Sequence, residues 1–233
     1  EVTLTNKGES DIAVQDVTVR LIGPAAEEVE AIESRTLQNQ GTLEGISELV
    51  PDGEEETVTF ASDAKYVNVV NGAIDREWFG EIVYNYKTFL IIPEVCLKED
   101  LTDDRICVVQ EAKDFFVSGA PVTVKAVNQD TAGKGIMALK IGVSNDGTGK
   151  VAKLGEEFGV RSQFSYGIDD PAWECKSSGK VNEGRFIDGK AEIVCKLIEP
   201  LAEDSLGTKQ VQLTLEYQYR DLISEKLRIK ESS

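Results

Sequence analysis

Short stretches in which apolar and polar residues alternate recur along the whole chain, and turn signals separate them. The first is Val2–Thr5, which stops at Asn6-Lys7-Gly8, and the strongest is Gly80–Ile92, rich in β-branched and aromatic residues. Alternation with a period of two places successive side chains on opposite faces of a strand. Strands of this kind, separated by turns and with few helical stretches, predict an all-β sandwich or barrel.

The remaining strands follow the same pattern, and one pair is joined by Asp188-Gly189, a strong hairpin signal. A single helix is expected at residues 24–35, where Pro24 suits the first helical position and the early glutamates suit the positive end of the helix dipole. Its apolar stripe is thin, so we expect it to decorate a loop. The further expected strands are 12–21, 57–60, 106–109, 122–127, 136–143, 158–166, 185–187, 191–197, 211–219 and 222–229.

An internal repeat links the two halves of the chain. Tyr84-Asn85-Tyr86-Lys87 recurs as Tyr217-Gln218-Tyr219-Arg220, 133 residues later, each time on an alternating strand late in its half. Tyrosines spaced by two residues point to the same face of a strand. In β-sandwiches a late tyrosine often packs at a corner with its hydroxyl bonded to backbone. We interpret the four tyrosines as structural, and an aromatic ligand platform is the alternative.

The length of 233 residues exceeds the usual size of one domain and fits two. We expect two tandem immunoglobulin-like β-sandwich domains, residues 1–113 with the decorating helix and residues 114–233. The boundary is expected in the segment Glu111–Pro121, which ends in a Ser-Gly-Ala-Pro linker. Phe115 and Phe116 are too apolar for a free tether, so we expect them to pack between the domains.

The four cysteines form two local pairs, with ten residues between Cys96 and Cys107 and nineteen between Cys175 and Cys195. Joining each local pair places one disulfide in each expected domain, the simplest of the three possible connectivities. Four free thiols in a cytosolic protein are one alternative, and a zinc site is another that lacks the usual close cysteine spacing. The even count, this layout and a first residue other than methionine favour an oxidising, extracellular setting.

The formal net charge of −17 argues against nucleic acid and anionic membrane surfaces as partners. Residues 1–118 carry −16 of it, and residues 119–233 carry −1. A solvated acidic surface explains this asymmetry; the alternative is that the acidic half binds cations or a basic neighbour. The chain contains no histidine, which excludes Ser-His-Asp triads, Cys-His dyads and histidine-bearing zinc sites. The sequence contains no run of ~18 apolar residues, the length that a helix needs to span a bilayer.

Carboxylates are the only reactive groups present in quantity. Two clusters of acidic residues are candidates for calcium ligands, but neither has the residue spacing of a calcium-binding loop. No phosphate-binding loop, nucleophile elbow or dinucleotide fingerprint occurs, so we expect neither an enzyme nor a bound cofactor. Trp78 and Trp173 could stack on sugars, although a core role is the simpler interpretation, with Trp173 packing on the nearby disulfide. The two acidic clusters are Asp100, Asp103 and Asp104, and Asp169 with Asp170.

The segment LVPDGEEETVTF, residues 49–60, resembles a stretch of CARDB-like and related bacterial and archaeal immunoglobulin-like adhesion modules. The turns at Asn6–Gly8 and Asn145–Gly147 fit the same modules. With the Tyr-x-Tyr strands, the local cysteine pairs and the linker GAPVTV, the chain resembles archaeal surface proteins with tandem sandwich domains. The second half departs from this pattern, because the segment from Pro200 to Leu213 lacks the Pro-x-Gly turn. The resemblance implies fold and location, and it transfers no catalytic residue.

These observations favour a non-catalytic structural, adhesion or assembly module of an extracellular surface protein, layer or filament. The alternative is a carbohydrate- or calcium-binding module of a secreted protein. The expected partners are other protein subunits, including further copies of the chain arranged head to tail. In that arrangement, the basic residues of the last strand, Lys226, Arg228 and Lys230, would meet the acidic first domain of the next copy.

Overall fold

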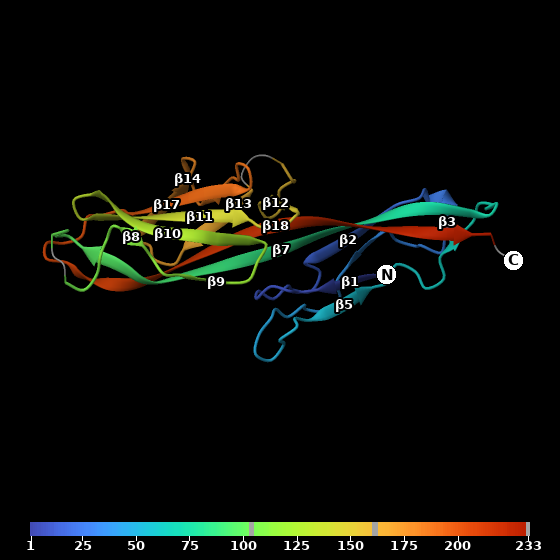
Figure 1. Ribbon diagram of the computed structural model, residues 1–233, viewed down its shortest axis with the longest axis horizontal. Helices are drawn as coiled ribbons and strands as arrows, with labels where there is room; N and C mark the ends of the chain where they lie inside the picture. Colours follow the sequence, from blue (N-terminus) through green and yellow to red (C-terminus); the bar gives the residue numbers. More distant parts are fainter. Residues whose placement is uncertain (103–104, 160–162, 232–233) are drawn as a thin grey trace. The chain divides into compact units, whose positions relative to one another are not determined.

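The computed structural model describes residues 1–102, 105–159 and 163–231, and almost all of the regular structure in them is antiparallel β-sheet (Figure 1). The predicted all-β class is therefore confirmed. The sheets form because the alternating segments place one apolar side chain in every two on a buried face. Within the described residues, no helix is long and apolar enough to cross a membrane.

The chain forms two compact units. Unit 1 comprises Glu1–Asn85 and Tyr219–Ser233, and unit 2 comprises Tyr86–Gln218. The two longest strands, β7 (Ala73–Lys98) and β18 (Leu206–Lys230), are hydrogen-bonded neighbours, and each continues from one unit into the other. Unit 2 is therefore an insertion between two segments of unit 1.

This division differs from the expected boundary between residues 113 and 114. The expected linker lies inside unit 2, where β9 (Phe116–Val117) pairs with β7 and Phe116 is 68% exposed. The strands expected at residues 211–219 and 222–229 are a single strand, β18, because no glycine or proline interrupts the backbone between them.

In unit 1, β2 lies between β4 and β7, and two further pairs of strands, β1–β5 and β3–β6, form two-stranded sheets. The β2–β7 register places Val17 opposite Tyr84 and Ile22 opposite Phe79. Val17 and Val19 are buried on one face of β2. The strands of unit 1 other than β7 and β18 are β1 (Val2–Thr5), β2 (Val17–Ile22), β3 (Val29–Glu30), β4 (Thr36–Gln38), β5 (Glu55–Val58) and β6 (Lys65–Tyr66).

The helix expected at residues 24–35 is absent; only a three-residue 3-10 turn, η1 (Ala26–Glu28), forms there. Val29 leaves the turn in extended conformation and pairs with Tyr66 in the β3–β6 ladder. Glu28 accepts hydrogen bonds from the Tyr66 hydroxyl and the Arg76 guanidinium. The thin apolar stripe offered too little burial to hold a helix against this pairing, because short helices depend on tertiary packing.

The turn at Pro51-Asp52-Gly53 depends on the backbone conformation of its glycine. Gly53 has φ of 71°, and a Cβ added there would lie 1.8 Å from the Asn6 carbonyl oxygen. The Gly53 amide donates to the Val50 carbonyl oxygen, and the Lys7 ammonium donates to the Asp52 carbonyl oxygen. Glycine is therefore required here both for the left-handed backbone and for the close approach.

We expect Gly53→Ala to lower the free energy of unfolding of unit 1 more than Gly72→Ala does. Gly72 also has positive φ, of 81°, but nothing lies within 4 Å of an added Cβ. The control therefore carries only the backbone strain, about 1–2 kcal/mol, whereas Gly53→Ala also forces the Asn6 backbone to move. Chemical denaturation of the two variants measures the difference; equal stability would show that the close approach is not present in solution.

Unit 2 contains two antiparallel sheets. The first has the order β15-β14-β17-β11-β10-β8, and the second continues β16-β13-β18-β7, with β9 beside β7 and β12 beside β18. The other strands of unit 2 are β8 (Glu111–Ala112), β10 (Val122–Gly133), β11 (Ile136–Asn145), β12 (Lys150–Ala152), β13 (Phe164–Ile168), β14 (Trp173–Ser177), β15 (Lys180–Val181), β16 (Glu183–Gly184) and β17 (Lys190–Leu197).

The buried faces of the two sheets form the core of unit 2. Leu139, Ile141 and Ile193 are fully buried on the first sheet, and Phe164 and Leu215 are fully buried on the second. The strand expected at residues 106–109 does not form. Of the strand expected at 158–166, residues 164–166 form the start of β13, residues 158, 159 and 163 are not in a strand, and residues 160–162 lie outside the described residues.

Candidate functional site

Both local cysteine pairs are joined by disulfides, Cys96–Cys107 and Cys175–Cys195. Cys175 and Cys195 lie directly opposite each other on β14 and β17, with their Cα atoms 3.9 Å apart. Both disulfides belong to unit 2, so the expected distribution of one per domain is not found. Two disulfides indicate an oxidising environment for this chain.

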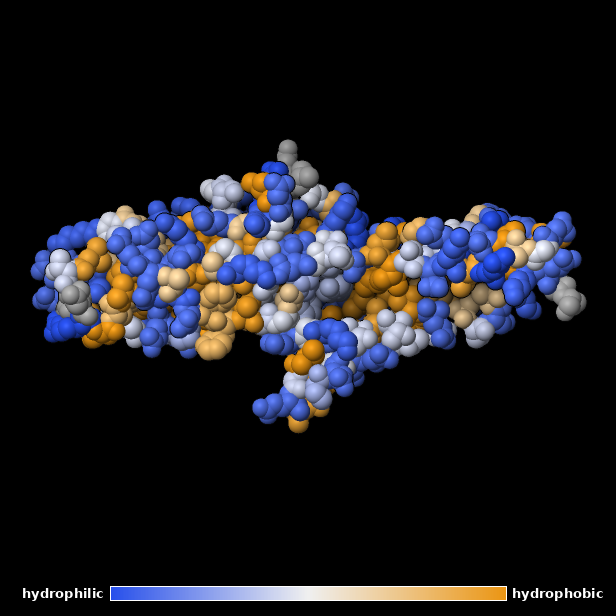
Figure 2. All heavy atoms as spheres, in the orientation of Figure 1, coloured by the Kyte–Doolittle hydropathy of each residue, from blue (hydrophilic) through white to orange (hydrophobic). Residues whose placement is uncertain are grey.

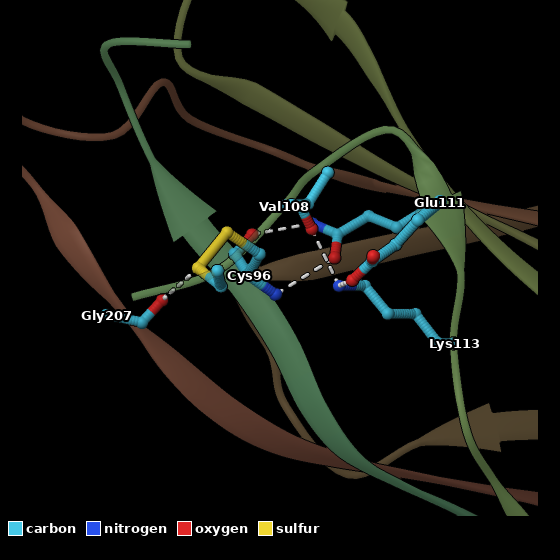
Figure 3. The surroundings of a disulfide bond; sticks show 7 residues. Cys96, Val108, Glu111, Lys113 and Gly207 are labelled. Atoms are coloured by element: carbon cyan, nitrogen blue, oxygen red, sulfur yellow. Dashed lines mark hydrogen bonds and ion pairs between the residues drawn. A yellow bond between two sulfur atoms is a disulfide. The ribbon is translucent and has the colours of Figure 1, made fainter. Parts of the chain in front are cut away.

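Hydrogen bonds and an ion pair surround the Cys96–Cys107 disulfide (Figure 3). The Gln129 side chain, 2% exposed, accepts a hydrogen bond from the Cys96 amide and donates one to the Cys96 carbonyl oxygen. Nearby, the nearly buried Lys113 ammonium donates to the Val108 carbonyl oxygen and pairs with Glu111 (Figure 3). These buried polar groups are paired, as stability requires, and they hold the disulfide loop against β10.

The two copies of the tyrosine repeat pack against each other. The ring centroids of Tyr84 and Tyr219 lie 5.5 Å apart in unit 1, and those of Tyr86 and Tyr217 lie 6.4 Å apart in unit 2. Tyr86, Tyr217 and Tyr219 are buried, and Tyr84 is half-buried. Tilted ring pairs at this separation are favourable. The structure thus places all four predicted tyrosines in packed positions of β7 and β18.

The Tyr217 hydroxyl closes a buried ring of hydrogen bonds. It accepts from the Val122 amide at 3.4 Å and lies 3.1 Å from the Thr88 hydroxyl oxygen. The Thr88 hydroxyl donates to the Val122 carbonyl oxygen at 2.6 Å, so the Tyr217 hydroxyl is the donor to Thr88. Because Val122 lies on β10 and the other two residues on β18 and β7, the ring joins the two sheets of unit 2.

The acidic residues proposed as calcium ligands are separated or already engaged. Asp170 forms an ion pair with Lys209 at 2.8 Å, which holds the pKa of its carboxyl below the usual value. Asp169 accepts from the Gln212 amide, and Asp100 accepts from the Thr102 amide and hydroxyl. Asp103 and Asp104 lie outside the described residues. Among the residues that the structure does describe, no cluster of carboxylates, cysteines or histidines could hold a metal ion.

The basic end of the last strand belongs to unit 1. Lys226, Arg228 and Lys230 are all exposed, and Lys226 forms an ion pair with Asp75 of β7 at 3.2 Å. Unit 1 has 9 Lys and Arg against 21 Asp and Glu, a net charge of −12; unit 2 has 16 against 21, a net charge of −5. The basic strand predicted to meet the acidic domain of another copy is therefore part of the acidic unit itself.

The outer face of the first sheet of unit 2 carries a groove of about 1120 Å³. Its floor is formed at Gly142, where β11 lacks a side chain, and by the small or apolar residues Val194 and Ala191 of β17. Its charged lining comprises five cations and two anions, namely Lys125, Lys176, Arg185, Lys190, Lys196, Glu174 and Glu192. The groove is therefore basic on a chain that is acidic as a whole.

Sequence reasoning did not identify this groove. The residues in the sequence that could have indicated it are the exposed members of the alternating strands. They are Lys190, Glu192 and Lys196 on β17, and Glu174 and Lys176 on β14. When each strand is considered alone, these charged residues resemble an ordinary solvent-exposed face. The β14–β17 register places Lys196 beside Glu174, and the β11–β17 register places Glu192 beside Gly142, which brings the charged rows to one concave surface.

Unit 1 carries a second, more apolar cavity of about 560 Å³, lined by Phe60, Trp78, Phe79, Ile223 and Leu227 among others. Trp78 is half-buried there, and the Arg35 guanidinium lies 5.6 Å from its ring centroid. Trp173, by contrast, is 4% exposed and lies on the same buried face of β14 as Cys175.

The ion pair between Asp130 and Lys140 gives a pH-dependent test of the first sheet. The Lys140 ammonium, with the Thr131 amide and the Gln110 side chain, lowers the pKa of the Asp130 carboxyl from 3.8 to about 2. Because the folded pKa is depressed, the stabilisation by this pair is present above the ordinary pKa and is lost as the pH falls from 3.8 towards 2.

We expect Lys140→Met to raise the Asp130 pKa towards its ordinary value, because the first of its three donors is removed. NMR titration of the Asp130 side chain measures this midpoint in both proteins. The exposed Lys150, which has no ion pair among the described residues, offers a matched control in Lys150→Met. An Asp130 midpoint unchanged by Lys140→Met would contradict the pairing.

The chain matches no protein-family model, no curated protein and no solved structure.

Proposed function

We propose that the chain is a non-catalytic structural or assembly module of an extracellular surface protein, layer or filament. The observation that carries the proposal is the presence of oppositely charged surfaces on one disulfide-bonded, all-β chain. Unit 1 has a net charge of −12, whereas the groove of unit 2 is lined by five cations and two anions. Complementary charge favours association between protein surfaces and fixes their register.

The extracellular location is supported by the disulfides. Cys96, Cys175 and Cys195 are buried and Cys107 is half-buried, and no free cysteine occurs in the described residues. Disulfides persist in oxidising compartments such as the cell surface. Closing loops of 11 and 20 residues in sequence separation also stabilises a small β-domain by roughly 3 kcal/mol each.

We further propose that unit 2 is immunoglobulin-like. Two packed antiparallel sheets and a buried tyrosine whose hydroxyl bonds to backbone support this. One feature differs from antibody domains, in which the disulfide joins the two sheets. Here Cys175–Cys195 joins neighbouring strands of one sheet. The likeness therefore concerns the architecture rather than the position of the disulfide.

Sedimentation velocity of the oxidised chain tests the proposed function. We expect the sedimentation coefficient to rise as the concentration increases from micromolar to millimolar, and the melting temperature to be unaffected by calcium or by soluble glycans. The alternative, a carbohydrate- or calcium-binding module, predicts the reverse: a monomer at every concentration whose melting temperature rises with one of these ligands, since ligands stabilise the folded state they bind. That result would overturn the assembly function.

A further inference from the structure

The groove of unit 2 presents cations that have no partner in the part of the chain that the structure describes. Lys190, Lys196 and Arg185 are exposed, and none of them forms an ion pair or a side-chain hydrogen bond among the described residues. Lys125 and Lys176 are paired with Asp146 and Glu174. Three of the cations that line the groove are therefore unpaired within residues 1–102, 105–159 and 163–231.

The floor between these cations is apolar. Val194 is half-buried, and Ile187 is 63% exposed. Gly142 contributes no side chain to the floor, and a Cβ added there would meet only Ala126, at 3.8 Å. A ligand that fits this surface needs an apolar group flanked by anions.

The loop Ser47–Gly53 of unit 1 has this chemistry. Leu49 is 92% exposed at its tip, between the exposed carboxylates of Glu48 and Asp52. Neither carboxylate has a partner among the described residues. The loop is also held in shape: the Ser47 amide donates to the Val50 carbonyl oxygen, and the Val50 amide donates to the Ser47 hydroxyl. A preorganised loop loses little conformational freedom on binding.

We propose that the groove of unit 2 binds the Ser47–Gly53 loop of a second copy of the chain. Leu49 covers the floor at Gly142 and Val194, and the carboxylates of Glu48 and Asp52 pair with the unpaired cations, Arg185, Lys190 and Lys196. The contact joins two different surfaces, so repetition produces a ring or an open filament. This inference rests on the proposed assembly function and names the two surfaces involved.

A second copy fits the groove better than an acidic polysaccharide does. Among the described residues, the lining contains no aromatic side chain on which a sugar ring could stack. A polysaccharide would use the cations and leave the apolar floor uncovered, whereas the loop uses both. The cations predicted from sequence to mediate assembly, Arg228 and Lys230, lie on the acidic unit and serve as a matched control.

Charge reversal tests the assignment. We expect Lys190→Glu with Lys196→Glu to weaken self-association about tenfold or more, because each attraction becomes a repulsion. Arg228→Glu with Lys230→Glu changes the net charge by the same amount and should weaken it far less. Mixing the groove variant with a Glu48→Lys, Asp52→Lys chain should restore association. Sedimentation equilibrium measures all four samples, and circular dichroism checks that each is folded.

Steric filling gives a second test that changes no charge. Gly142→Leu places a side chain on the floor without straining the backbone, since Gly142 has no positive φ and ordinary contacts, and it should also abolish association. If the wild type associates but the groove variants behave like the control, the groove assignment is wrong and the assembly function stands. A wild type that stays monomeric overturns both. Loss of polygalacturonate binding in the groove variants, with association unchanged, would assign the groove to an acidic glycan.

Discussion

Replacing Tyr217 with alanine is expected to lower the free energy of unfolding of unit 2 by about 3–5 kcal/mol. The side chain is fully buried, packs against Tyr86, and carries the hydroxyl that bridges Thr88 and the Val122 amide. Its removal leaves a cavity between the two sheets and an unpaired buried amide. Denaturant unfolding monitored by circular dichroism measures the change.

Tyr217→Phe separates the contribution of the Tyr217 ring from that of its hydroxyl, and Tyr84→Ala gives a comparison at the other ring pair. Tyr217→Phe keeps the ring but leaves the Val122 amide and the Thr88 hydroxyl short of a partner, for an expected loss of about 1–3 kcal/mol. Tyr84→Ala removes the half-buried member of the other ring pair and should cost less than Tyr217→Ala. A Tyr217→Phe protein as stable as the wild type would contradict the buried hydrogen-bond ring.

Replacing both Cys175 and Cys195 with alanine is expected to destabilise unit 2 by about 3 kcal/mol. The disulfide closes a segment of 20 residues in sequence separation and lies in the core, where both cysteines are buried. Its loss raises the conformational entropy of the unfolded chain and removes packing beside Trp173. Thermal melts of the oxidised wild type and the double variant measure the effect.

Chemical reduction of the wild type provides the control, because it opens both disulfides without changing the sequence. We expect the reduced protein to melt at a lower temperature than the double variant, which keeps Cys96–Cys107. Equal melting temperatures for the oxidised and reduced wild type would show that the disulfides do not stabilise this fold in solution.

Much of the fold could be predicted from local pattern. Alternation identified the strands that became β7, β10, β11, β17 and β18, and Asp188-Gly189 marked a tight turn, with Ile187 paired to Lys190. The favoured cysteine connectivity is the one found, since each pair was close in sequence. The tyrosine repeat indicated packed positions, because period-two spacing fixes a shared face.

The division into units could not be predicted in this way, because it depends on which strands pair over long distances. The segments at residues 211–219 and 222–229 look like two strands, yet they form one that runs through both units. The helix expected at residues 24–35 does not form, because Val29 pairs instead with Tyr66, a residue distant in the sequence. The groove was missed because its charges come from separate strands, each of which resembles a solvated face.

We propose that copies of this chain assemble through surfaces of opposite charge. The most direct measurement is the dissociation constant for self-association of the oxidised wild type, determined by sedimentation equilibrium over a series of salt concentrations. We expect the dissociation constant to increase steadily as the salt concentration rises, because screening reduces the attraction between exposed charges. A dissociation constant that is independent of salt, or a strict monomer at the highest concentration, would contradict it.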